Sequence, residues 1–114
     1  MKNIFLICLF STLVISTSVS ADCLKNEIGK VVCGEGQCVT DQYGKVFCSD
    51  AGGGAIKNLR GIVECGVGRC ITDSSKKIWC SNEVKGDAAL DPEGNVRCIG
   101  ECVPGSAALC HEAK

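Results

Sequence analysis

The chain has 114 residues, a formal net charge of −1 and 11 cysteines, but only 4% of its residues are aromatic. So few large side chains cannot bury enough apolar surface to stabilise a domain of this size, whereas many cysteines are typical of disulfide scaffolds. Charges of both signs are interspersed without a basic stripe, which argues against nucleic-acid binding and against cationic membrane attack.

The first 21 residues have the pattern of an export signal. Lys2 supplies a positive charge, residues 4–15 are apolar apart from Ser11 and Thr12, and small residues precede and include Ala21. A run of about 12 apolar residues is shorter than the roughly 20 that a bilayer requires. We therefore predict a signal peptide over 1–21 and a secreted, extracellular chain without a membrane span.

Removal of the signal also removes Cys8 and leaves ten cysteines, an even number that predicts five disulfides. The C-x2-C pairs of zinc sites are absent, and the single histidine, His111, follows the last cysteine. An exported chain also meets an oxidising compartment, where thiols pair. We expect neither a metal nor a cofactor.

An internal duplication organises the rest of the chain. Residues 23–50 and 55–82 align without a gap and agree at 13 of 28 positions. A third, worn copy is recognisable from the G-x-V-x-C motif that ends at Cys98. The sequence predicts a first cysteine-rich repeat over 22–50, a flexible Gly-rich linker over 51–54, a second repeat over 55–82 and a degenerate third over 83–114.

In each good copy, the segment between the last two cysteines predicts a β-hairpin. In the first copy, residues 41–44 form a four-residue type I turn with Asp at its start and Gly at its end. That loop length would place Val39 opposite Val46, and Ile71 opposite Ile78 in the second copy. The predicted fold is small, disulfide-rich and β-hairpin-based, with two tandem homologous cystine modules and a degenerate third.

The spacing of the cysteines does not by itself select their pairing, because ten cysteines allow about 945 complete pairings. The spacing C-x9-C-x4-C-x9-C in residues 23–48 resembles the first four cysteines of an EGF-like module and is similar to the start of follistatin-type modules. The C-x-C that continues those modules is absent, since Cys48 and Cys80 are each followed by Ser. The resemblance implies that the first cysteine pairs with the third and the second with the fourth. Carried along the chain, it implies the pairs Cys23–Cys38, Cys33–Cys48, Cys65–Cys80 and Cys98–Cys110, with Cys70–Cys102 joining the second and third copies.

Two aromatic residues occupy the same position in the two good copies, just before the last cysteine of each hairpin. Phe47 and Trp79 could each contact a partner, or could cover the disulfides of a scaffold that is short of apolar side chains. The sequence favours the structural role, and the contact role stays open as a possible partner site.

Basic residues on clamped loops suggest two other kinds of contact. Arg69, inside a C-x4-C loop, or Lys77, near a predicted turn, could be the bait residue of a serine-protease inhibitor. The triplet Lys85-Gly86-Asp87 is similar to the tripeptide of secreted integrin antagonists, although a polar spacer with a turn is the commoner explanation.

An enzyme is not expected. The acid pairs Asp91 with Glu93 and Asp73 with Glu83 lack a concave site, and His111 has no Ser or free Cys to activate. We predict a secreted cysteine-rich binding protein of the venom, salivary-effector or extracellular-ligand type. It would engage an extracellular protein (a receptor, an integrin or a protease) through disulfide-clamped loops, with a serine-protease inhibitor as the alternative.

Overall fold

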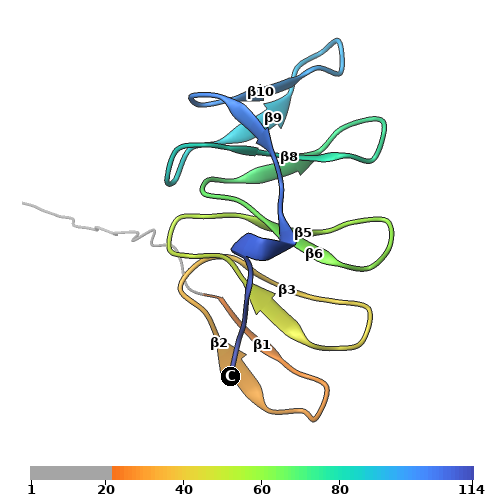
Figure 1. Ribbon diagram of the computed structural model, residues 1–114, viewed down its shortest axis with the longest axis vertical. Coiled ribbons are helices and arrows are strands. Elements are labelled where there is room, and N and C mark those ends of the chain that lie inside the picture. Colours follow the sequence, from red (N-terminus) through yellow and green to blue (C-terminus); the bar gives the residue numbers. More distant parts are fainter. Residues whose placement is uncertain (1–21) are drawn as a thin grey trace, which may run out of the picture.

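The computed structural model describes residues 22–114, so the predicted signal peptide over 1–21 lies outside the described residues. The described chain forms five antiparallel β-hairpins, stacked side by side in chain order (Figure 1). A small disulfide-rich β-hairpin fold is therefore confirmed. The hairpins are β1 (Cys23–Lys25) with β2 (Val31–Cys33), β3 (Cys38–Thr40) with β4 (Val46–Cys48), β5 (Ala55–Lys57) with β6 (Val63–Cys65), β7 (Cys70–Thr72) with β8 (Ile78–Ser81), and β9 (Ala88–Leu90) with β10 (Val96–Cys98).

Each hairpin turns on an Asn or Asp whose side-chain oxygen accepts two backbone hydrogen bonds. In the second hairpin, Asp41 Oδ1 accepts from the N–H groups of Tyr43 at 2.8 Å and Lys45 at 3.0 Å. Gly44 then adopts φ 86°, a left-handed conformation that costs glycine little. The other four turns repeat this arrangement with the pairs Asn26 and Gly29, Asn58 and Gly61, Asp73 and Lys76, and Asp91 and Gly94.

The register of the hairpins differs from the prediction by one residue. Val39 lies opposite Phe47 rather than Val46, and Ile71 lies opposite Trp79 rather than Ile78. The reason is that Asp41 N–H donates to the carbonyl of Lys45 at 2.8 Å, so Asp41 belongs to the ladder and the loop has three residues instead of four.

This register decides the disulfides. Cys38 lies directly opposite Cys48, with their Cα atoms 4.0 Å apart, and the two form a disulfide across their own hairpin. The same bond closes the first and fourth hairpins. All ten cysteines are paired as predicted, but the pairing implied by the EGF-like resemblance is wrong, because directly opposed cysteines are the nearest partners on a short hairpin. The observed pairs are Cys23–Cys33, Cys38–Cys48, Cys70–Cys80, Cys65–Cys110 and Cys98–Cys102.

The third and fifth hairpins begin with alanine where the others begin with cysteine. Ala55 lies opposite Cys65, and Ala88 lies opposite Cys98. Neither cysteine therefore has a partner within its own hairpin, and both bond to the C-terminal segment instead.

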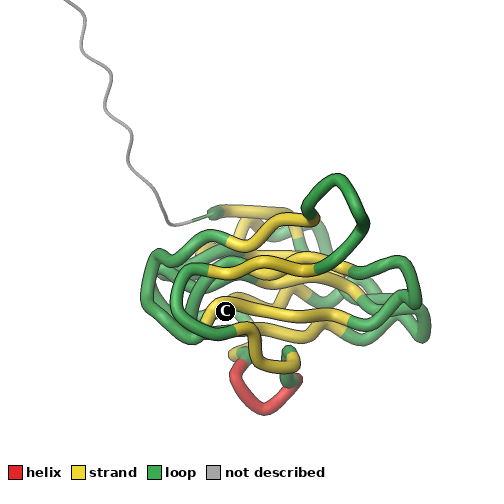
Figure 2. Tube along the Cα trace, turned by 90° about the horizontal axis from the view of Figure 1, so that it is seen from above, coloured by secondary structure: helices red, strands yellow, loops and turns green. Residues whose placement is uncertain are grey.

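That segment, residues 102–113, is called the C-terminal strap. After Cys98 the chain forms no further hairpin but turns back along one face of the stack, where Figure 2 shows it with the short helix in red. Its strand β11 (Cys102–Pro104) pairs with β8, and its strand β12 (His111–Glu112) pairs with β4. Between them, Ser106 forms a β-bridge with Cys65 just before the 3-10 helix η1 (Ala107–Leu109). The strap thus joins the second, third and fourth hairpins on one face.

At the end opposite the turns, the segments that connect the hairpins form what we call the spine. The N–H of Gln37 donates to the carbonyl of Gly53 at 3.3 Å, and the carbonyl of Gln37 accepts from Ser49 at 3.0 Å. Equivalent pairs of bonds occur at Asp22, Gly54 and Arg69. The glycine-rich segment 51–54, expected to be a flexible linker, is built into this ladder, with Gly53 and Gly54 buried.

The core is small, as the composition predicts. One cluster of buried residues comprises Val32, Val46 and the Cys38–Cys48 disulfide, and a second comprises Ala55, Val63 and Cys65. The interior is therefore made of disulfides and β-branched side chains, and the aromatic residues lie around it.

Candidate functional site

A small apolar pocket lies between two neighbouring turns and the strap. Its volume is about 130 Å³. The lining residues come from the turn of the second hairpin, from β4, from the turn of the third hairpin and from the strap; they are Asp41, Gln42, Tyr43, Phe47, Gly61, Ile62, Val63, Ala107 and Cys110.

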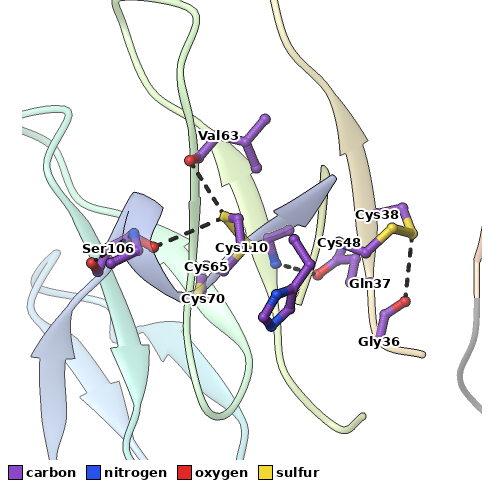
Figure 3. The surroundings of a disulfide bond; sticks show 12 residues. Gly36, Gln37, Cys38, Cys48, Val63, Cys65, Cys70, Ser106 and Cys110 are labelled. Atoms are coloured by element: carbon purple, nitrogen blue, oxygen red, sulfur yellow. Dashed lines mark hydrogen bonds between the residues drawn. A yellow bond between two sulfur atoms is a disulfide. The ribbon is translucent and has the colours of Figure 1, made fainter. Parts of the chain in front are cut away.

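Three elements hold the pocket walls in place. Gln42 N–H donates to the carbonyl of Gly61 at 3.0 Å, which fixes the second turn against the third. The Cys65–Cys110 disulfide fixes the strap against the third hairpin, and Cys110 Sγ lies 3.4 Å from the carbonyl oxygen of Val63 (Figure 3). The pocket therefore depends on a disulfide that links residues 45 positions apart.

Exposed apolar side chains stand at the tips of the first three turns. The exposed fractions are 77% for Ile28, 73% for Tyr43 and 77% for Leu59. The same turn positions in the fourth and fifth hairpins hold Ser74-Ser75 and Pro92-Glu93. Apolar exposure is thus concentrated on one half of the turn edge, next to the pocket.

The two equivalent aromatic residues have different surroundings. Phe47 packs against the cluster of Ala55, Val63 and Cys65 and also lines the pocket. Trp79 is bound within its own hairpin, since its Nε1–H donates to Asp73 Oδ2 at 2.9 Å and Lys77 Nζ lies 4.5 Å from its ring centre. Phe47 is therefore the one of the two that lines the pocket between the turns and the strap.

The two candidate bait residues lie on opposite edges of the stack. Arg69 is in the spine, where its N–H donates to the carbonyl of Gly86 at 2.8 Å and its guanidinium lies 3.5 Å from Asp87. The carbonyl of Arg69 also accepts a hydrogen bond from the N–H of Ser81 at 2.9 Å, so its backbone is bonded in the spine on both sides. Lys77 follows the fourth turn, and its ammonium stacks on Trp79.

The triplet Lys85-Gly86-Asp87 does not lie at a hairpin tip. Gly86 is buried in the spine and hydrogen-bonded to the backbone of Glu83 at 2.8 Å. Asp87 accepts a bond from the N–H of Ala88 at 2.8 Å and pairs with Arg69. The triplet is a spine element whose central residue is covered.

Two turn carboxylates have a pKa below the ordinary value of 3.8. The pKa of Asp73 is lowered chiefly by the bond from the Trp79 indole and then by the N–H of Lys77. The pKa of Asp91 is lowered chiefly by the N–H of Asn95, with a further contribution from Arg97, whose Nε lies 3.1 Å away.

The remaining titratable candidates are also engaged locally. His111 Nε2 lies 2.9 Å from Asp50 Oδ1 on the spine side of β12. Among residues 22–114, no group of three or more His, Cys, Asp or Glu side chains is arranged to hold a metal ion. Within the same range, no helix has the length and apolarity needed to cross a membrane.

Comparison of the chain with protein-family models, with curated proteins and with solved structures found no match. The site therefore rests on its own geometry. The pocket was not predicted, because two of its lining residues, Ala107 and Cys110, come from the strap, whose return along the stack has no local signal. The one available signal was the pair of alanines that leaves Cys65 and Cys98 without partners in their hairpins.

Proposed function

We propose that this chain is a secreted binding protein that engages an extracellular protein through the pocket between the second turn, the third turn and the strap. The observation that carries the proposal is the apolar pocket itself, rimmed by Tyr43 and Ile62 and held by the Cys65–Cys110 disulfide. Export is supported by the predicted signal peptide and by the five disulfides of the described chain.

The size of the pocket favours a protein over a small molecule. Sites for drug-sized ligands usually measure about 300–1,000 Å³, more than twice the volume available. A pocket of about 130 Å³ suits a single apolar side chain of a partner, and such anchored side chains carry most of the binding energy at protein interfaces. Tyr43 and Ile62, at the mouth of the pocket, would surround that anchor and exclude water from it.

Disulfide cross-linking also suits binding through a small surface. The walls of the pocket are fixed before a partner arrives, so little conformational entropy remains to be lost on association. A small contact area can then be enough for specific binding of a partner protein.

The test is the binding of the labelled, oxidised protein to intact cells, before and after trypsin removes cell-surface proteins. We expect saturable, trypsin-sensitive binding that falls about tenfold with Ile62→Ser, as for the loss of an interface anchor. Ile99→Ser is the matched control, because Ile99 is also exposed, at 54%, but lies in the spine. A second variant, Ala107→Leu, places a larger side chain at the pocket wall formed by η1 and should also weaken binding.

Binding that survives trypsin, or that Ile62→Ser and Ile99→Ser weaken equally, would contradict the proposal. Both substitutions replace exposed side chains, and peptide mapping without reduction shows whether each variant has formed the native disulfide pairs.

A further inference from the structure

The turn edge of the first three hairpins combines apolar tips with an excess of cations. Each of its basic residues is exposed and lies within three positions of Ile28, Tyr43 or Leu59. We call this surface the basic rim. Its cations are Lys25, Lys30, Lys45, Lys57 and Arg60, and its acidic residues are Glu27 and Asp41.

Among the residues that the structure describes, the cations of the basic rim form no ion pair. Among residues 22–114 the ion pairs are Arg69 with Asp87 and Arg97 with Asp91, and His111 lies against Asp50; none of these contacts involves the rim. In the other two hairpins, Arg97 is paired with Asp91 and Lys77 is stacked on Trp79, which leaves Lys76 as the exposed cation of those turns without such a contact in the described chain. The positive charge of the rim is therefore available to an external partner.

The three turns lie next to one another, so the rim is continuous. Gly44 of the second turn faces the backbone of Glu27 in the first, and Gln42 of the second is bonded to Gly61 in the third. Figure 1 shows these turns in a row along one edge of the stack.

The opposite edge carries the opposite charge. The acidic residues of the spine are Asp22, Glu35, Asp50, Glu83, Asp87 and Glu101, against the two cations Arg69 and Lys85. Strands of three or four residues separate the edges by roughly 10–13 Å, more than one Debye length at physiological ionic strength, so the spine does not cancel the field of the rim. The fold thus separates charges that are interspersed in the sequence.

We propose that the basic rim docks on an anionic lipid surface, a function beyond the protein binding assigned to the pocket. Apolar side chains at the membrane interface, flanked by lysine and arginine, combine burial of apolar area with attraction to anionic headgroups. Three tips on separate turns, with cations between them, suit a fluid interface, where each tip can enter without a matching pocket. The acidic spine then faces solvent and orients the molecule with the rim toward the membrane.

The experiment uses flotation of the oxidised protein with phosphatidylcholine vesicles, prepared with and without phosphatidylserine. We expect binding only to the vesicles that contain phosphatidylserine. Because each cation near an anionic surface contributes about a fivefold change in affinity, Lys30→Gln with Lys57→Gln should weaken binding on the order of twentyfold. Ile28→Ser with Leu59→Ser should weaken it by about tenfold or more.

The matched control is Lys76→Gln with Lys85→Gln, which removes the same charge outside the rim. Both of these lysines are exposed, one at the fourth turn and one in the spine, and we expect less than a twofold change. An equal loss in the control would show general electrostatic attraction and overturn the rim as the docking site. Equal binding to both kinds of vesicle would overturn the role of charge.

A protein partner for the rim is the remaining outcome. In that case the protein would not bind vesicles, and the rim variants would reduce its trypsin-sensitive binding to cells. This result would overturn the lipid proposal. Ala107→Leu separates the two proposals, because Ala107 lines the pocket from the strap and not from the turn edge, so the variant should leave vesicle binding unchanged while it reduces binding to cells.

Discussion

The strap disulfide gives the most direct test of the fold. We expect Cys65→Ala with Cys110→Ala to lower the free energy of unfolding more than Cys70→Ala with Cys80→Ala does. The two pairs are matched for burial, since Cys65 and Cys80 are both 0% exposed. They differ in the sequence separation of the bonded cysteines, 45 residues against 10.

The magnitude follows from the loop that each bond closes in the unfolded chain. In the chain-entropy model, a loop of about 45 residues corresponds to about 4 kcal/mol and a loop of about 10 residues to about 2.7 kcal/mol. The variants should therefore differ by roughly 1.3 kcal/mol, with the strap variant less stable.

Denaturant titration followed by the fluorescence of Trp79 is the assay. Trp79 is a suitable reporter because it lies opposite Pro104 of the strap in the β8–β11 ladder. An equal loss in the two variants, or a larger one for the hairpin bond, would refute the reasoning. Peptide mapping without reduction checks the pairing, and a Cys65–Cys80 linkage would contradict the structure itself.

Three further predictions concern the turns and the spine. Gly68→Ala should destabilise the protein more than Gly94→Ala, because a Cβ on Gly68 would overlap the backbone of Glu83. Gly94 faces open space, so alanine there costs only about 1 kcal/mol for the positive φ, and thermal melts of both variants compare the two losses. Lys76→Gly should raise the melting temperature, by the equivalent of about 0.5–1 kcal/mol, because Lys76 has φ 74° where the other turns have glycine. Asp73→Asn should flatten the acid side of the plot of unfolding free energy against pH. The pKa of Asp73 is lower in the folded than in the unfolded chain, so the carboxylate stabilises the fold at pH values above its unfolded pKa of about 3.9, and this contribution disappears as pH falls through the folded pKa. Urea titrations between neutral pH and about pH 3 measure this, and an unchanged pH dependence would contradict the assignment.

The hairpins could be predicted from the sequence because their signals are local. An Asx residue marks each turn, a glycine three positions later marks every turn but the fourth, and β-branched residues flank the turns. The register was missed by one residue because the rules for a type I turn do not state whether Asp41 pairs with Lys45. The same signal also marks the turns of residues 26–29, 58–61 and 91–94, so the duplicated unit contains two hairpins where one was predicted.

The strap and the surfaces could not be predicted, because they depend on contacts between distant residues. Nothing near Ser106 indicates that it bridges to Cys65, some 40 residues earlier in the chain. The basic rim was missed for the same reason: its cations are spread from Lys25 to Arg60 and gather only when the turns stack. Gly36 and its equivalents in the spine do carry a signal, since a side chain at Gly36 would overlap the backbone of Asp50.

The two alanines that open the third and fifth hairpins also simplify oxidative folding. In the first, second and fourth hairpins the two cysteines lie directly opposite each other, so formation of the hairpin brings them together and their bonds should form first. Four thiols then remain, at Cys65, Cys98, Cys102 and Cys110, and four cysteines have only three possible pairings instead of about 945. A cysteine in place of Ala55 would restore a local competitor for Cys65, so the absence of a thiol there guides the chain to its native connectivity.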